Sequence, residues 1–240
     1  MCFFSNLPIG IGLLCLATIG PVSGATIEFL DQSGDSVSFS NITEVNGSTD
    51  SSFSLFGGVS TMNDTLDFDA FNLRVEPVSG FEFDDGRLSL SAISDSGSLI
   101  SSIKISQSGL ATTLGEASAN VDLGGSVTVD GVRSPTASTS FTKDSSAGDS
   151  FDSEFWEREL IFSFSPTDEV RLDINHSIFA SVTSGALGTL EANGLLIQVN
   201  TIAGTIGGST TAIALPEPSS WLALGGIGGT LTLRRFRRRT

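Results

Sequence analysis

Alternation of apolar and polar residues runs through most of this chain, and a period of two is the pattern of β-strands rather than helices. It is clearest from Val170 to Val182, where apolar side chains at even positions alternate with residues such as Arg171 and Asn175. Shorter segments with the same period are separated by residues that favour turns, and no helical period of useful length appears. We therefore predict an all-β fold, an antiparallel β-sandwich of jelly-roll or Greek-key type, over residues 26–202.

Turn signals divide this region into strands. Residues 31–35 predict the turn of an opening hairpin, and Asp85-Gly86 and Asp130-Gly131, each between alternating segments, predict two-residue hairpin turns. Residues 134–150 are rich in Ser, Thr and Ala and predict a loop.

The N-terminus has the pattern of an export signal. Ile9 to Ile19 is an apolar segment of signal-peptide length, and the small residues that follow it predict a signal peptide over residues 1–25 with cleavage after Ala25. The alternative is an N-terminal anchor or a buried strand. Both cysteines, Cys2 and Cys15, precede Ala25. The mature chain is then expected to have no disulfide, cysteine-ligated zinc or cysteine nucleophile.

The C-terminus predicts a membrane segment. After a linker over residues 203–215, Pro216 and Pro218 prevent a helix from forming through Glu217. The uncharged residues that follow form a helix of about 22 Å, shorter than the roughly 30 Å hydrocarbon core. The terminal arginines are expected to stay in the cytoplasm and place the rest of the chain outside. The alternative is a C-terminal strand of the core. The span and its anchor comprise Trp221, Leu222, Leu224, Ile227, Leu231, Leu233, Arg234, Arg235, Arg237, Arg238 and Arg239.

Residues 216–240, with Pro216-Glu217-Pro218, a short glycine-rich apolar segment and an arginine cluster, resemble the PEP-CTERM sorting domain of exopolysaccharide-producing bacteria. The resemblance implies that an exosortase-type membrane protease recognises the tripeptide and removes the tail during sorting to the cell surface. It implies an exported protein of the cell envelope or extracellular matrix, held in the membrane before processing. The resemblance does not extend to the domain in front of the tail.

Charge limits the partners of the exported part. Between the leader and Glu217 there are 7 basic and 26 acidic residues, a net charge of −19. Nucleic acids and anionic lipids are bound through basic patches, so we predict no nucleic-acid partner. An acidic surface is compatible with solubility, with cation binding or with repulsion from acidic polymers, and the simplest interpretation is a solvated acidic surface.

Few residues are candidates for catalysis. His176 is the only histidine, and alternation places it on the strand face opposite Ser177 and Asp173, which argues against a catalytic triad. We expect it to be a partly buried or edge-strand histidine.

Carboxylates are more plentiful. Asp64, Asp67 and Asp69, and separately Glu82, Asp84 and Asp85, could present oxygens to Ca²⁺, although neither group has the spacing of an EF-hand loop. The simpler interpretation is the solvent-facing side of a strand. No cofactor is predicted apart from this Ca²⁺ alternative.

Phe155 and Trp156 lie among charged residues and are the candidate aromatic platform for a sugar ring. The competing interpretation is a core aromatic residue at the start of a strand.

Three functions are compatible with these features of the sequence. The first is an exported, non-catalytic surface or matrix protein associated with exopolysaccharide. The second is a carbohydrate-binding or Ca²⁺-dependent adhesive module. The third is a glycan hydrolase that uses two carboxylates.

Overall fold

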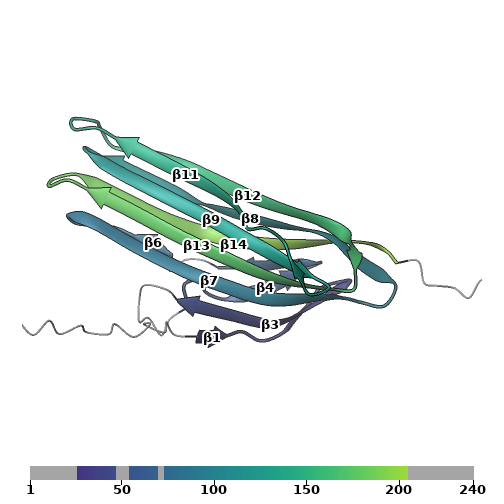
Figure 1. The fold of residues 1–240 in the computed structure, drawn as a ribbon. Coiled ribbons are helices and arrows are strands. Elements are labelled where there is room, and N and C mark those ends of the chain that lie inside the picture. The colour runs from purple at the N-terminus through teal and green to yellow at the C-terminus, as the bar shows by residue number, and fades with distance from the viewer. Residues whose placement is uncertain (1–25, 47–53, 70–72, 205–240) are drawn as a thin grey trace, which may run out of the picture. The chain divides into compact units, whose positions relative to one another are not determined.

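The computed structural model describes residues 26–46, 54–69 and 73–204, which form 14 β-strands in two antiparallel sheets (Figure 1). The predicted all-β sandwich is confirmed. The predicted signal peptide over residues 1–25, the Pro216-Glu217-Pro218 motif, the predicted membrane segment and the arginine cluster lie outside the described residues. Within the described part of the chain, no helix is long and apolar enough to cross a membrane.

Two sheets make up the sandwich. Sheet A has the order β1-β3-β7-β13-β9, with β10 and β11 on the far side of β9 and β2 beside β3. Sheet B has the order β12-β8-β14-β5-β4, with β6 beside β14. The strands of sheet A are β1 (Thr26–Glu28), β2 (Gln32–Ser33), β3 (Val37–Asn46), β7 (Gly80–Ser94), β9 (Ala117–Val129), β10 (Val132–Arg133), β11 (Ala137–Ser145) and β13 (Glu169–Val182). Those of sheet B are β4 (Val59–Met62), β5 (Thr65–Phe68), β6 (Arg74–Val75), β8 (Ser98–Leu114), β12 (Asp152–Thr167) and β14 (Leu187–Ala203).

One hydrophobic core lies between the inner faces of the sheets. Alternation along β13 places the even-numbered residues from Val170 to Val182 in this core, as predicted. Strand β13 is central in sheet A and pairs with β7 on one side and β9 on the other. Its odd-numbered residues therefore point away from the core, in the middle of the outer face of sheet A.

The hairpin predicted at Asp85-Gly86 is wrong, because β7 continues from Gly80 to Ser94 without a turn. Gly86 is buried on the inner face, and a Cβ atom there would lie 3.1 Å from side-chain atoms of both Leu55 and Phe56. A glycine within a strand commonly marks such a close approach. Its role here is to admit two apolar side chains to the core.

The other turn predictions have mixed outcomes. Asp130 and Gly131 both have positive φ, 50° and 76°, and join β9 to β10 in the predicted two-residue turn. The opening hairpin is present, although its turn lies at residues 34–36, after β2. The loop predicted over residues 134–150 is wrong, because it contains strand β11. Only two large side chains of β11, Phe141 and Lys143, are buried, so its alternation is weak in the sequence.

Candidate functional site

The outer face of sheet A carries the candidate site, and the odd-numbered residues of β13 form its central row. From one end of β13 to the other these are Arg171, Asp173, Asn175, Ser177, Phe179 and Ser181. Ten residues of strand span about 33 Å, so this row is long enough for an extended ligand. Three surface hollows lie in succession along it.

The central hollow has a volume of about 680 Å³. It is lined by residues from four neighbouring strands, β3, β7, β13 and β9, and from the start of β11 and the residue before it. Asp85 and Asp122 lie on either side of Ser177, and Arg87 lies beside Asn175. Carboxylates, an amide, a hydroxyl and a guanidinium therefore share one surface with the ring of Phe83, which is 43% exposed.

Aromatic rings continue the face toward the tip of β7. Phe83 lies directly opposite Phe179 in the pairing of β7 with β13. Phe81, 73% exposed, stacks on Phe179 with 6.1 Å between ring centroids and an angle of 27° between the ring planes. Three phenylalanines of sheet A therefore lie together at the surface, where they leave apolar area open to solvent.

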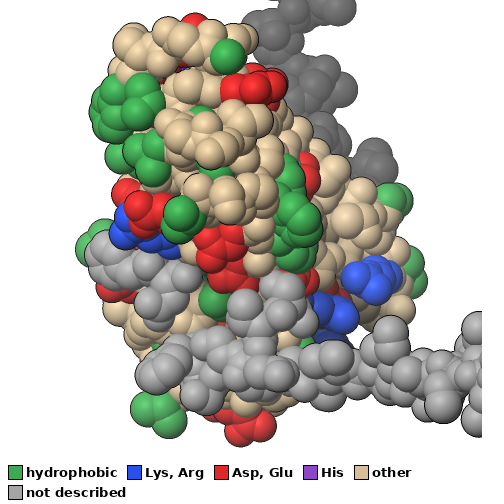
Figure 2. Space-filling view, turned by 90° about the vertical axis from the view of Figure 1, so that its left-hand side faces the viewer, with side chains coloured by type: hydrophobic (Ala, Val, Ile, Leu, Met, Phe, Trp, Pro, Cys, Tyr) green, Lys and Arg blue, Asp and Glu red, His purple; other side chains and the backbone are tan. Residues whose placement is uncertain are grey.

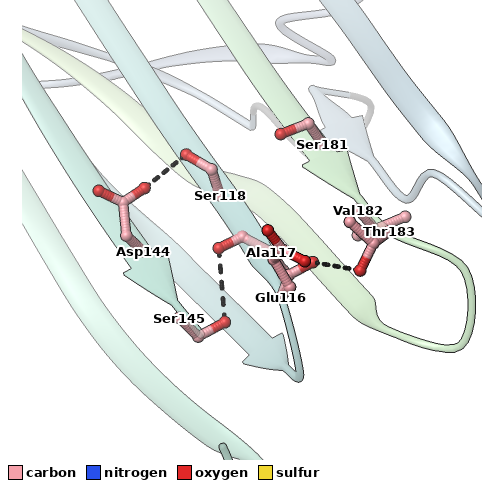
Figure 3. A pocket seen from close by; sticks show the side chains of 8 residues that line it. All are labelled: Glu116, Ala117, Ser118, Asp144, Ser145, Ser181, Val182 and Thr183. Atoms are coloured by element: carbon pink, nitrogen blue, oxygen red, sulfur yellow. Dashed lines mark hydrogen bonds between the residues drawn. The ribbon is translucent and has the colours of Figure 1, made fainter. Parts of the chain in front are cut away.

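A second hollow, of about 400 Å³, lies at the strand ends (Figure 3). Ser118 of β9 donates a hydrogen bond of 2.6 Å to Asp144 of β11, and Ser181 of β13 lies across from them. The hydroxyl of Thr183 donates to the carbonyl oxygen of Glu116 at 3.3 Å. Hydroxyl and carboxylate side chains line this hollow together with Ala117 and Val182.

Figure 2 faces the strand ends drawn at the left of Figure 1, where hydrophobic clusters and acidic side chains lie on the surface and few Lys or Arg are in view.

Charged side chains are grouped around Asp173 on this face. Its carboxylate is buried and accepts a hydrogen bond of 2.7 Å from the hydroxyl of Ser89 and one of 3.2 Å from Arg87. Burial opposes ionisation of Asp173, but the hydrogen bonds from Ser89 and Arg87 and the charges of Arg87 and Arg171 outweigh it and lower its pKa. Asp173 is therefore ionised throughout the neutral range.

The inner face beneath the central hollow holds buried titratable groups. Burial raises the pKa of Asp84 to about 6, and burial also raises the pKa of Glu44. Burial lowers the pKa of His176 to about 3. Alternation places these side chains on the inner face, and all three are buried, so they are not available to a ligand on the outer face.

The prediction that His176 is a partly buried or edge-strand histidine is wrong, because the residue is fully buried on a central strand. It is 2% exposed on the central strand of sheet A, and neither ring nitrogen has a hydrogen-bond partner. Ser177 and Asp173 do lie on the opposite strand face, as alternation predicted. These three residues therefore form no triad.

The two predicted platform residues separate on opposite faces of β12. Phe155 is 64% exposed on the outer face of sheet B, away from the hollows of sheet A. Trp156 is 2% exposed and stacks on Phe141 with 6.1 Å between ring centroids, so it offers no ring face to a ligand. For Trp156 the competing interpretation, a core aromatic residue, is the one that the structure supports.

Neither carboxylate group forms a metal site. Asp64 accepts hydrogen bonds from the amide and hydroxyl of Ser36, at 2.7 and 2.5 Å, and does not line the hollow that contains Asp67 and Asp69. Asp84 points inward while Asp85 points outward. Among residues 26–46, 54–69 and 73–204, no group of three or more His, Cys, Asp or Glu side chains is placed to hold a metal ion.

Sequence reasoning missed the residues that define this face. Phe83, Phe179 and Arg87 come from two strands and meet only through strand pairing. The sequence offered one signal for this face. Only seven basic residues precede the tail, and three of them are Arg87, Arg133 and Arg171.

No family model matches the chain, and no curated protein matches it. A solved structure, TmCBM61 in complex with β-1,4-galactotriose, is similar with a TM-score of 0.21 and 12% identity, over 56% of this chain and 70% of that chain. The enzymatically active domain of tailspike protein 4 from bacteriophage CBA120 is similar with a TM-score of 0.20 and 10% identity, over 69% of this chain and 19% of that chain. At this level of similarity, neither structure defines a ligand for this chain.

Proposed function

We propose that this β-sandwich is a non-catalytic glycan-binding module whose ligand lies along the outer face of sheet A. The observation that supports it best is the central hollow, where a half-exposed phenylalanine lies beside hydrogen-bonding groups from neighbouring strands. A sugar ring has an apolar C–H face and a rim of hydroxyl groups. Phe83 suits the first, while Asp85, Asp122 and Asn175 suit the second.

The sheet supplies the rigidity that such a site needs. Strand β13 pairs with β7 and with β9 along nearly its whole length, so the backbone under the hollow is held on both sides. Groups fixed on paired strands lose little conformational freedom when a ligand binds. The length of the row along β13 also suits a linear chain better than a compact molecule.

Replacing Phe83 with alanine is expected to weaken glycan binding about tenfold, which corresponds to about 1.4 kcal/mol, because one stacking surface is lost. The measurement is affinity electrophoresis and isothermal titration of the full chain against a panel of neutral and acidic polysaccharides. Phe155→Ala is the matched control, since it removes an exposed phenylalanine from the outer face of sheet B.

Equal weakening by Phe155→Ala, or no effect of Phe83→Ala, would contradict this placement of the ligand. Release of reducing sugar during the same incubations would contradict a non-catalytic role. Asp85 and Asp122 would then be the first candidates for a carboxylate pair, since both line the central hollow.

The proposal also includes export and sorting. Its support is the sequence of residues 1–25 and 216–240, which lie outside the described part of the chain. We expect the wild-type protein to lose both ends and to reach the surface or matrix fraction. In cells without the exosortase-type protease, we expect it to keep its arginine tail and stay in the membrane. Intact-mass measurement on each fraction checks this, and an uncut tail on a protein found in the cytoplasm would refute it.

A further inference from the structure

Three arginines converge on one carboxylate on the outer face of sheet A. The terminal nitrogens of Arg87, Arg133 and Arg171 lie 3.2, 3.9 and 3.8 Å from the carboxylate oxygens of Asp173. They come from β7, β10 and β13, so only the pairing of these strands brings them together. In a segment with a net charge of −19, nearly half of the basic residues lie within reach of a single acidic group.

The cluster carries more positive charge than Asp173 needs. One carboxylate neutralises one guanidinium, so the three arginines and Asp173 together have a net charge of +2. Their side chains are 49%, 53% and 61% exposed for Arg87, Arg133 and Arg171, so much of each guanidinium is open to solvent. Asp173 and Ser126, which accepts a hydrogen bond of 2.8 Å from Arg133, occupy only some of their N–H donors.

The remaining basic residues before the tail have a different environment. Arg74 pairs with Glu76 at 2.8 Å, Lys104 pairs with Glu159, and Lys143 lies between Asp152 and Glu154. Arg158 donates to main-chain oxygens and lies over the ring of Phe141. In each of these ion pairs at least one acid is present for each cation. The excess of cations over acids at Asp173 is therefore a local feature rather than a property of the surface.

The cluster borders the hollows of the candidate site. Arg87 lines the central hollow, and Arg171 lines the smaller one of about 190 Å³. A ligand that stacks on Phe83 and continues along β13 therefore passes the three guanidiniums. Asp85 and Asp122 lie beyond Arg87 toward Phe83, so negative charge on the ligand is favoured only at the arginine end.

We infer that the arginine cluster binds an oxyanion substituent of the glycan, a carboxylate or a sulfate ester, so that the ligand is an acidic polysaccharide. Guanidinium groups recognise both through paired N–H···O hydrogen bonds, and Asp173 holds the three side chains in position for it. This inference rests on the proposed glycan-binding function of the same face and specifies the class of ligand.

The test compares probes that differ only in charge. The full chain is titrated in 0.15 M salt, where the Debye length of about 8 Å screens repulsion from distant acidic residues. Polygalacturonate is compared with its methyl ester, and dextran sulfate with dextran. The two pairs distinguish a carboxylate from a sulfate. Wild-type protein is expected to bind at least one charged polymer tenfold or more tightly than its neutral counterpart.

The double variant Arg133→Gln and Arg171→Gln removes the surplus charge and leaves Arg87 paired with Asp173, so folding should be retained and is checked by thermal unfolding. We expect it to lose at least tenfold in affinity for the charged polymer and to change little toward the neutral one. The matched control is Arg74→Gln with Lys104→Gln, which removes the same charge from sheet B. Its expected effect is less than twofold.

Equal losses in the two double variants would overturn the inference, because the effect would then come from net charge alone. Equal affinity of the wild type for charged and neutral polymers would also overturn it. Binding to a neutral polymer that depends on Phe83 would then leave the proposed function intact. Binding to none of the polymers would contradict both the inference and the proposed glycan-binding function.

Discussion

Replacing His176 with leucine is expected to raise the free energy of unfolding by about 1–3 kcal/mol at pH 7 and by more in acid. At pH 7 the gain comes from removing two buried ring nitrogens that have no hydrogen-bond partner. Leucine is similar in size and suits the surrounding core, where Leu123 lies opposite His176 in β9.

The acid effect follows from the direction of the pKa shift. Burial lowers the pKa of His176 to about 3, while an unfolded histidine has a pKa of about 6.5. Between these values the unfolded chain binds a proton that the folded chain does not bind, so stability falls as pH falls from 6.5 toward 3. At pH 4 the resulting loss is about 3 kcal/mol, and the leucine variant should not show it.

Two carboxyl groups buried on the inner face, those of Asp84 and Glu44, act in the opposite direction. The pKa of Asp84 is raised to about 6 and that of Glu44 is also raised, so the folded state binds their protons more readily. Their contribution to stability is present at low pH and is lost as pH rises through these pKa values. In the wild type, the loss of stability at His176 opposes this contribution. The His176→Leu variant lacks that loss, so its stability should increase as pH falls from 6 to 4.

Urea denaturation at pH 7, 6, 5 and 4 measures these effects on wild-type protein and the variant. Ser177→Ala is a suitable control, because it changes the next residue of β13 on the outer face. A leucine variant that is less stable at pH 7, or that loses stability in acid as the wild type does, would contradict the account of His176. The chain has one histidine, so no other imidazole contributes.

Replacing Trp156 with alanine is expected to lower the free energy of unfolding by about 3–5 kcal/mol. The indole is 2% exposed, stacks on Phe141 from the opposite sheet, and covers Gly109 of β8. A Cβ atom at Gly109 would lie 2.4 Å from Cζ2 of this ring, so β8 has a glycine where the indole needs space. Alanine would leave a cavity between the sheets.

Thermal and urea unfolding measure this effect, and Trp156→Phe should retain much of the stability because a ring still fills the site. The matched control is Phe155→Ala, one residue away and 64% exposed, with an expected change below about 0.5 kcal/mol. If Phe155→Ala were the more destabilising, the two side chains of β12 would have to exchange faces.

The sequence alone determined that this chain forms an antiparallel β-sandwich, because the period of two records which face of each strand is buried. That information is local, and it held for β13, for the turn at Asp130-Gly131, and for the opposite faces of His176 and Ser177. It failed at Gly86, which has the pattern of a turn but provides space in the core, and at β11, which has few large buried side chains.

Only the tertiary structure decided which outward residues share a surface. Alternation shows which face of its own strand each of Phe83, Asp122 and Arg133 occupies. Whether these side chains share one surface depends on strand order and register between segments far apart in the chain. Phe155 and Trp156 are neighbours in sequence, yet one faces solvent and the other fills the core. The candidate site is therefore a product of pairing across β7, β13 and β9, because the side chains that form it come from three strands with no common local pattern.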